Sequence, residues 1–395
     1  MKPVILHQAI ATFLTLAVAS CGFNGHHREE NGDTAQVEIM DLTAEAMQWA
    51  DSVTMRMDTA RLGAQVLMPA LYASDDPWTV ALLQRYAREG IGGIILLKGT
   101  VEEARTLADS MRRVSAVDPF VAIDAEWGLN MRLADAPKFP ANGRLSPKVQ
   151  DQLMYDYGRE VARECRQIGI NMVLGPVLDV TRRDSYVGVR SFGSDPRRVS
   201  DLGLAYGKGL SGGGVMPVAK HFPGHGTVRT DSHKGKGVID GSLQRLDTVD
   251  LVPFRAWSAA GMPAVMVGHL AVPAIDSKML PAAVSSTIIS DLLRGDLRFS
   301  GLVLTDAMNM LGAEGYTAAD ALRAGSNLIL APADTEGELA GITESVRQGT
   351  LPLDTLRQRV RLILFHKYLL RRAPDIPESI STPQADSLAR ELSEL

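Results

Sequence analysis

Short apolar runs recur along the chain. They are separated by longer amphipathic stretches, in which apolar residues recur at helical spacing among polar ones. The runs are continuous rather than alternating, which is typical of strands buried on both faces in a parallel sheet. They are Ala64–Met68, Gly92–Leu97, Phe120–Ile123, Met172–Leu174, Val215–Ala219, Ala264–Val267, Gly301–Leu304 and Asn327–Leu330. We predict a buried strand at each of them.

The stretches between the runs predict helices, because their apolar residues recur every three to four positions. The clearest are Trp78–Glu89, Val101–Val114, Gln150–Gln167, Thr335–Arg347 and Leu353–Leu370. Strands that alternate with helices about eight times predict an α/β fold of the (β/α)8 TIM-barrel type. An open doubly wound sheet is the alternative, but no Gly-rich dinucleotide turn follows a strand. We expect the barrel to span residues 37–372 and a short tail to occupy 373–395.

The first residues of the chain predict an export signal. Lys2 precedes an apolar stretch, Ala9–Ala19, that is too short to cross a bilayer as a mature helix. Residues 18–21 (Val-Ala-Ser-Cys) resemble the bacterial lipobox, which implies removal of residues 1–20 and lipidation of the Cys21 thiol. Residues 21–36 are polar and aperiodic, as expected of a flexible tether. We therefore expect a cell-envelope protein held to a membrane by a lipid; a plain signal peptide cut nearby is the alternative.

Composition narrows the class of protein further. Of the 395 residues, 45% are apolar, which is enough for a large core and excludes intrinsic disorder. The 41 Lys and Arg residues are balanced by 46 Asp and Glu residues without a basic run, so nucleic acid is not expected as a partner. The two cysteines, Cys21 and Cys165, cannot form a disulfide framework. Cys165 is most simply a small buried residue of a helix.

Charged or titratable residues follow four of the predicted strands. They are Asp124, the pair Lys220 and His221, His269, and Asp306. The carboxyl ends of barrel strands meet at one mouth, where active sites lie, so we expect these side chains to share a site. A single acid after a strand is ordinary, whereas four such groups on one predicted barrel indicate function.

The segment 220–233 carries three histidines, one aspartate and one lysine, and its glycines and proline predict a loop. In one interpretation, a metal is held by His221, His225, His233 and Asp231. In the other, Asp231 accepts a proton from His233 and orients an imidazole that acts as acid and base near neutral pH. Lys220 would oppose a cation here, so the residue types favour the dyad, and we expect neither a metal nor a cofactor.

Four motifs in this order along the chain resemble glycoside hydrolase family 3, in particular its β-N-acetylhexosaminidase branch. They are the Asp-x-Glu-x-Gly strand end at 124–128, the Arg-Ser-Phe-Gly-x-Asp-Pro element at 190–196, the Lys-His-Phe-Pro-Gly-His-Gly…Asp-Ser-His signature at 220–233 and the nucleophile strand at 301–308. The resemblance runs from about Gly63 to Leu370. It implies a barrel and an exported, retaining exo-β-N-acetylglucosaminidase that acts on peptidoglycan fragments, chitooligosaccharides or glycans.

The same resemblance implies roles for individual residues. Asp306 would attack the anomeric carbon, and His233, polarised by Asp231, would protonate the leaving oxygen and later activate water. The substrate would be bound by Asp124, Arg132, Arg190, Lys220 and His221.

Departures from the family pattern, such as Trp127 and Thr227, leave alternatives open. The same fold could act on β-glucosides or β-xylosides, or transfer the sugar to phosphate, since a neutral His233 repels an anion less than a carboxylate would. A carbohydrate-binding lipoprotein without catalysis is a further alternative, against which the intact Asp231, His233 and Asp306 argue. A metal hydrolase would be excluded by activity that is insensitive to chelation.

Overall fold

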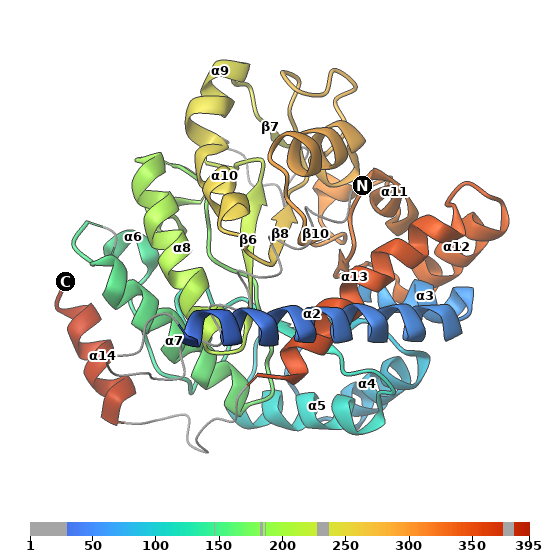
Figure 1. Ribbon diagram of the computed structural model, residues 1–395, viewed down its shortest axis with the longest axis horizontal. Helices are drawn as coiled ribbons and strands as arrows, with labels where there is room; N and C mark the ends of the chain where they lie inside the picture. The colour runs from blue at the N-terminus through green and yellow to red at the C-terminus, as the bar shows by residue number, and fades with distance from the viewer. Residues whose placement is uncertain (1–29, 146, 182–184, 186, 227–236, 374–382) are drawn as a thin grey trace.

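The computed structural model describes residues 30–145, 147–181, 185, 187–226, 237–373 and 383–395, and it consists of parallel strands surrounded by helices (Figure 1). The strands are β1 (Leu67–Met68), β2 (Ala70–Leu71), β3 (Gly93–Leu96), β4 (Phe120–Ile123), β5 (Met172–Val173), β6 (Met216–Phe222), β7 (Gly237–Val238), β8 (Ala264–Val267), β9 (Leu270–Ala271), β10 (Leu302–Thr305) and β11 (Ile329–Leu330). The helices are α2 (Glu30–Arg56), α3 (Thr59–Gln65), α4 (Pro77–Glu89), α5 (Val101–Val114), α6 (Asn142–Leu145), α7 (Asp151–Gln167), α8 (Pro196–Gly212), α9 (Leu243–Arg245), α10 (Val252–Ala259), α11 (Ala318–Ala324), α12 (Thr335–Arg347), α13 (Leu353–Arg371), α14 (Pro383–Ser393) and the π-helical η3 (Leu246–Asp250) and η5 (Thr287–Asp296).

The strands close into a ring of parallel, hydrogen-bonded neighbours. One sheet runs in the order β10-β8-β6-β5-β4-β3-β2, and β1 pairs with β11. The ring closes between β10 and β11, where the Thr305 N–H donates to the Leu328 carbonyl at 3.0 Å. β1 and β2 are one extended segment interrupted at Pro69, which has no N–H to donate. The predicted (β/α)8 barrel is confirmed.

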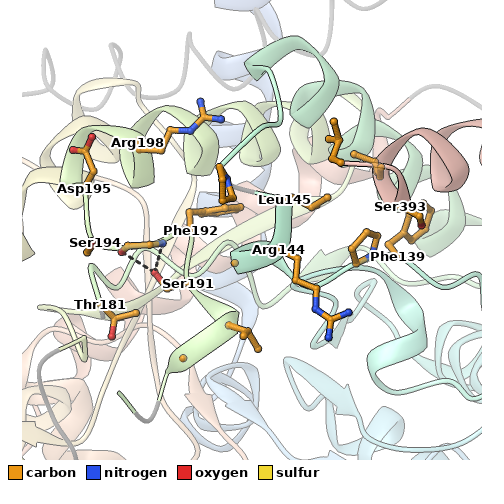
Figure 2. Close-up of a pocket in the computed structure, with 18 of the residues that line it drawn as sticks. Phe139, Arg144, Leu145, Thr181, Ser191, Phe192, Ser194, Asp195, Arg198 and Ser393 are labelled. Carbon is orange, nitrogen blue, oxygen red and sulfur yellow. Dashed lines mark hydrogen bonds between the residues drawn. The ribbon is translucent and has the colours of Figure 1, made fainter. Parts of the chain in front are cut away.

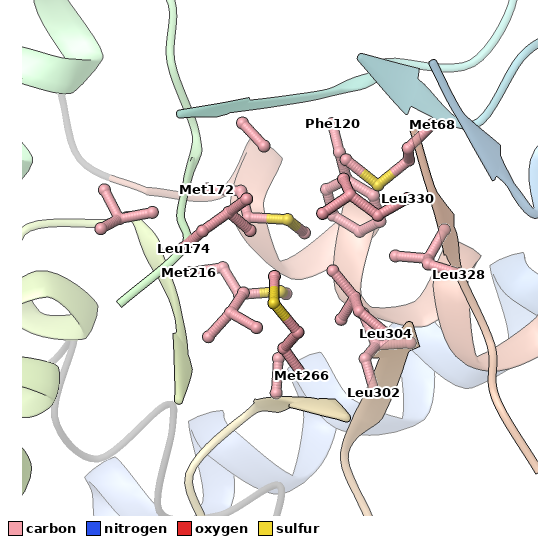
Figure 3. Close-up of a cluster of buried hydrophobic side chains, with 14 of the residues drawn as sticks. Met68, Phe120, Met172, Leu174, Met216, Met266, Leu302, Leu304, Leu328 and Leu330 are labelled. Carbon is pink, nitrogen blue, oxygen red and sulfur yellow. The ribbon is translucent and has the colours of Figure 1, made fainter. Parts of the chain in front are cut away.

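Long apolar side chains fill the inside of the barrel (Figure 3). Met68, Met172, Met216 and Met266 are at most 1% exposed and lie together with leucines of β10 and β11. Methionine is unbranched and fills irregular gaps well, which suits a closed barrel interior. A ligand site must therefore lie at one end of the barrel rather than through it.

Helices α7 and α8 pack backbone to backbone on the outside of the barrel. A Cβ atom at Gly158 would lie 2.3 Å from the Tyr206 carbonyl oxygen, and one at Gly209 would lie 2.2 Å from that of Tyr155. No larger residue fits at these two positions without moving a helix. The α8 hydroxyl of Tyr206 donates to the Ala125 carbonyl at 2.6 Å, so this helix pair fixes the segment that follows β4.

Helix α2 packs against α13, and both lie across the same part of the molecule (Figure 1). The Trp49 and Tyr368 rings are 5.5 Å apart, and Arg361 pairs with Asp51. Helix α2 begins at Glu30, within the segment 21–36 for which we expected a tether. Cys21 and the expected signal at 1–20 lie outside the described residues. Within the described ranges, no helix combines the length and apolar character needed to cross a membrane.

Two predicted strand boundaries differ from the observed ones by three residues, more than any other. The first predicted strand begins at Ala64, but Ala64 belongs to α3, a helix whose start is capped by Asp58. The strand predicted to end at Ala219 continues to Phe222 as β6, and the Lys220 carbonyl still accepts a ladder bond from Leu178 at 2.7 Å. Lys220 and His221 therefore lie on the strand itself, because a charged side chain ends the apolar run without ending the backbone pairing.

Candidate active site

A cavity of about 440 Å³ opens at the carboxyl ends of the barrel strands. Part of its wall is apolar and includes Leu97, Leu174, Met266, Leu330 and Trp127. Its charged and polar lining residues are Asp124, Glu126, Arg132, Arg190, Lys220, His221, His225, Asp306 and Asn309. The cavity therefore combines an apolar surface with a dense polar array, as carbohydrate and other small-molecule sites do.

Asp124 follows β4 and lies between two cations. Its Oδ1 accepts a hydrogen bond from the Lys220 Nζ at 2.7 Å, and its Oδ2 accepts one from the Arg132 Nη2. Burial raises the pKa of the Asp124 carboxyl, but Lys220 and Arg132 outweigh burial and hold the pKa well below its usual range. Asp124 is thus a fixed carboxylate, whose remaining lone pairs can accept protons from hydroxyl groups.

Glu126 shares Lys220 with Asp124. The Lys220 Nζ lies 2.7 Å from a carboxylate oxygen of each acid, although this lysine is only 3% exposed. Arg190 donates to Glu126 from Nε at 3.0 Å and from Nη2 at 2.7 Å, a bidentate arrangement that fixes the guanidinium plane. Burial lowers the pKa of Lys220, but Asp124 and Glu126 raise it above its usual value. Lys220 therefore stays an ammonium ion.

Asp179 is fully buried behind two histidines. Its Oδ2 lies 2.7 Å from Nδ1 of His221, and its Oδ1 accepts the backbone N–H of His225 at 2.7 Å. Burial raises the pKa of Asp179, but His221 and His225 bring it down to about 2. An ionised Asp179 requires the proton on Nδ1 of His221, so Nε2, which lies 3.4 Å from Arg190, is the nitrogen directed at the site.

Asp306 directly follows β10 at the cavity. Its backbone N–H donates to Val267 at 2.8 Å, and its Oδ1 accepts the Ala307 N–H at 2.8 Å. Burial raises the pKa of Asp306, but His221 and His269 lower it below its usual value. Among the described residues no cation forms an ion pair with Asp306, so a carboxylate oxygen stays available to an incoming atom.

Six of the predicted site residues line this one cavity: Asp124, Arg132, Arg190, Lys220, His221 and Asp306. Asp231 and His233 lie outside the described residues, and their dyad stays a prediction. The residues on either side of that segment are fixed at the mouth. The Gly226 carbonyl accepts the Thr181 hydroxyl at 2.8 Å, and Gly237 in β7 pairs with Leu270 in β9.

Four further polar residues neighbour the predicted ones: Glu126, Asp179, His225 and His269. Of these, His225 is predicted from the sequence only as a possible metal ligand. Glu126 lies in the Asp-x-Glu-x-Gly motif at 124–128, but the family resemblance implies no role for it. Asp179 follows an apolar run as Asp124 does, yet Gly175 and Pro176 separate it from β5, so a search for acids directly after strands misses it. His269 follows β8 as the sequence predicts, and the Nε2 of its ring lies 3.1 Å from the Ala307 carbonyl beside Asp306.

The histidine-rich segment does not form a metal site within the described ranges. No group of three or more His, Cys, Asp or Glu side chains there is placed to hold a metal ion. Of the four ligands considered, His221 and His225 are described, and the Nδ1 of His221 is taken by Asp179. The described geometry thus gives the Nδ1 of His221 a carboxylate partner, Asp179, in place of a metal ion.

A wider hollow of about 1210 Å³ lies beside this site (Figure 2). It is formed by loops after β4 and β5 and by the end of α14, with Phe139, Arg144, Phe192 and Ser393 among its lining residues. Asp195 is the acidic residue of the described lining of this hollow. Its carboxylate caps α8 by accepting the Arg197 N–H at 3.0 Å. The hollow therefore lacks a free pair of acid and base groups in its described lining, and the chemistry belongs to the smaller cavity.

Comparisons with known proteins show which family the chain resembles. The family described as "Glycosyl hydrolase family 3 N terminal domain" matches residues 65–365. A beta-hexosaminidase of Chromobacterium violaceum is 35% identical over 283 residues, which is 67% of this chain and 79% of the relative. A beta-N-acetylglucosaminidase/beta-glucosidase of Cellulomonas fimi is 26% identical over 90% of this chain and 68% of its own.

A solved structure extends the likeness to three dimensions. The glycoside hydrolase family 3 beta-N-acetylglucosaminidase of Paenibacillus sp. str. FPU-7 superposes with a TM-score of 0.77 at 28% identity, covering 86% of this chain and 68% of that one. The matched family region contains the closed barrel, the acid after β10 and the charged array around Lys220. On this evidence the chain belongs to glycosyl hydrolase family 3.

Proposed function

We propose that the protein is a retaining exo-β-N-acetylglucosaminidase. The observation that carries the proposal is Asp306, an ionised carboxylate without a paired cation, in a cavity whose other acids are held by Lys220, Arg132 and Arg190. Among the described acids of the cavity, only Asp306 is ionised without forming an ion pair. The barrel below is filled with side chains, so the site ends blind, which favours binding of a terminal sugar.

The reaction has two steps. In the first, an Asp306 oxygen bonds to the anomeric carbon, the glycosidic C–O bond breaks, and the leaving oxygen takes a proton from His233. In the second, His233 takes a proton from water, the water oxygen bonds to the anomeric carbon, and Asp306 is released as a carboxylate. Asp231 would orient His233 for both proton transfers.

The charged array would bind the sugar. Asp124 can accept hydroxyl protons, while Arg190, Lys220 and the Nε2 of His221 lie beside it as polar partners. Each of these groups is already oriented by an ion pair or hydrogen bond, so little ordering is needed on binding. The names of two relatives include N-acetylglucosaminidase, and one of these also includes beta-glucosidase. The identity of the 2-substituent is therefore the point to test.

The first experiment compares 4-nitrophenyl N-acetyl-β-D-glucosaminide with the matching β-glucoside on the full chain. We expect selective turnover of the N-acetyl substrate and its loss by at least about a thousandfold in Asp306→Asn. Asp291→Asn removes an exposed acid on η5 and is the matched control, which should keep full activity. Selective turnover of the glucoside would refute the substrate, and equal loss in both variants would refute the nucleophile.

The His233 role is tested by the leaving group. His233→Asn should lower kcat/KM strongly for a chitooligosaccharide, whose leaving hydroxyl needs a proton, and much less for the nitrophenyl substrate, whose phenolate leaves unaided. An equal loss for both substrates would mean that His233 acts in binding or structure instead. Asp231→Asn should follow the same pattern more weakly.

Peptidoglycan fragments and a lipid anchor on Cys21 belong to the same proposal. Labelling of cells with a fatty-acid analogue should mark the full chain and fail to mark Cys21→Ala. Cys165→Ala is the control, because the Cys165 thiol is fully buried in α7 and should not be labelled. Release of free N-acetylglucosamine from purified muropeptides, absent in Asp306→Asn, would support the substrate. No release would exclude it while leaving the reaction itself untouched.

A further inference from the structure

A second cationic cavity lies at the opposite end of the barrel. It measures about 250 Å³ and borders the residues that precede β4, β5 and β6, so it faces away from the active site. Its lining residues include Arg112, Arg166, Lys367, Arg371 and Asp118. Four cationic side chains and one carboxylate therefore surround a small space that the proposed reaction does not use.

Lys367 of α13 is the most buried of these cations, at 2% exposure. Its Nζ donates to the amide oxygen of Gln65 at 2.8 Å and lies 5.3 Å from the centre of the Phe120 ring. An ammonium group has three donors, so two remain without a protein acceptor among the described residues. Burial lowers the pKa of Lys367 to about 7, and Asp118 offsets this only in part.

Arg112 and Arg166 lie over two neighbouring turns. Arg112 of α5 donates to the Gly169 carbonyl before β5, and Arg166 of α7 donates to the Gly213 carbonyl at 3.4 Å before β6. Gly169 has φ +79°, and a Cβ there would lie 2.5 Å from an Arg112 nitrogen. The turn is therefore shaped to admit the guanidinium beside the cavity. Within the described ranges, Arg112 has no carboxylate partner.

The acidic side chain of the lining does not balance this charge. Asp118 is paired with Arg371 at 2.8 Å, and within the described ranges neither Lys367 nor Arg112 forms an ion pair with a carboxylate. Gathering like charges in a partly buried space is unfavourable unless an anion enters. The active site differs, because there the carboxylates of Asp124 and Glu126 accompany the cations.

We propose that this cavity binds a phosphate dianion, either free or as the monoester of a small metabolite. Planar guanidinium groups match two oxygens of a phosphoryl group, and the Lys367 ammonium supplies a point charge with free donors. The anion would join α5, α7 and α13 at the base of the barrel. It is a structural ligand, since the catalytic mouth lies at the other end of the strands.

The test is calorimetric titration of the full chain with sodium phosphate at about pH 7, against sodium chloride of equal ionic strength. We expect saturable phosphate binding that weakens at least about tenfold in Arg112→Gln. Arg113→Gln is the matched control: it removes the same charge one residue along α5, but its side chain is 78% exposed and should leave binding unchanged. Lys367→Met should also abolish phosphate binding. The thermal stability of this variant without phosphate should not fall, because the substitution removes a buried charge.

Three results would overturn the proposal. One is no binding beyond that of chloride. Another is equal weakening by Arg112→Gln and Arg113→Gln, which would indicate diffuse surface attraction. The third is phosphate binding that N-acetylglucosamine competes away and that Arg112→Gln leaves unchanged. That result would place the bound phosphate in the active site. Titration with glycerol 3-phosphate separates the two sources, since the tighter ligand identifies the free ion or the monoester.

Discussion

Glu164 offers the sharpest test of the packing between α7 and α8. Its side chain lies on α7, is fully buried, and has no hydrogen-bond partner for either carboxylate oxygen among the described residues. Burial raises the pKa of Glu164 to about 9, with a further rise from Glu160 and a partial offset from Arg163. The native protein therefore holds this group as a neutral acid at neutral pH, whereas the unfolded chain ionises it.

The magnitude follows from linkage. The pKa of Glu164 is raised on folding, so its contribution to stability is fully present below about pH 4.5 and is lost as the pH rises toward 9. Each pH unit costs about 1.4 kcal/mol, and the interval from 4.5 to 7 costs about 3.4 kcal/mol. Glu164→Gln keeps the shape and cannot ionise, so its free energy of unfolding should exceed that of the wild type by about 3 kcal/mol at pH 7.

The assay is urea unfolding of both proteins at several pH values between about 5 and 8. The advantage of Glu164→Gln should grow by about 1.4 kcal/mol per pH unit. Glu160→Gln is the control on the same helix, because Glu160 accepts two hydrogen bonds from Arg163, at 2.6 and 2.9 Å, and its loss should not stabilise the protein. A difference between Glu164→Gln and the wild type that does not change with pH would refute the argument.

Three other substitutions test single features of the fold. Asp250 is 1% exposed and burial raises its pKa to about 6, so the wild type should lose stability between about pH 4 and 6. Above about pH 6, the free energy of unfolding of Asp250→Asn, measured with urea, should exceed that of the wild type by about 3 kcal/mol. Thr100→Ala removes the capping box of α5 and should cost about 1 kcal/mol in the same assay. Tyr206→Phe removes the bond to the Ala125 carbonyl and should cost about 1–2 kcal/mol. Because Ala125 lies between Asp124 and Glu126, that variant should also raise KM for the nitrophenyl substrate, and an unchanged KM would mean that the segment is held by other contacts.

The sequence was most informative where an apolar run ends in a charged side chain. Phe120–Ile123 and Ala264–Val267 were predicted with the bounds that the structure has, because each is a continuous buried run between polar neighbours. Asp124 and Asp306 follow such runs, and the shared direction of parallel strands was enough to predict that they meet.

What could not be predicted depends on contacts between distant segments. Glu126 and Arg190 are 64 residues apart, and their bidentate pairing needs the loops after β4 and β5 to converge. The Asp179–His221 bond spans 42 residues in the same way. Such ion pairs leave no periodic signal in one sequence, since each partner taken alone is an ordinary polar residue. The break between β1 and β2 at Pro69 has a local cause. The pattern of apolar runs still did not predict β2 on the far side of this proline.

The two ends of the barrel handle positive charge in opposite ways, and this difference argues for different ligands. At the mouth, Lys220, Arg132 and Arg190 each contact a carboxylate, so the array offers many hydrogen-bonding positions with little net field. That arrangement suits a sugar, which is polar and here uncharged, and leaves the charge of Asp306 for the anomeric carbon. At the base, Lys367 and Arg112 have no carboxylate partner among the described residues, so no ion pair offsets their positive charge. A small anion fits that end better than a sugar does, which is why phosphate binding should respond to Arg112→Gln while turnover of the glycoside does not.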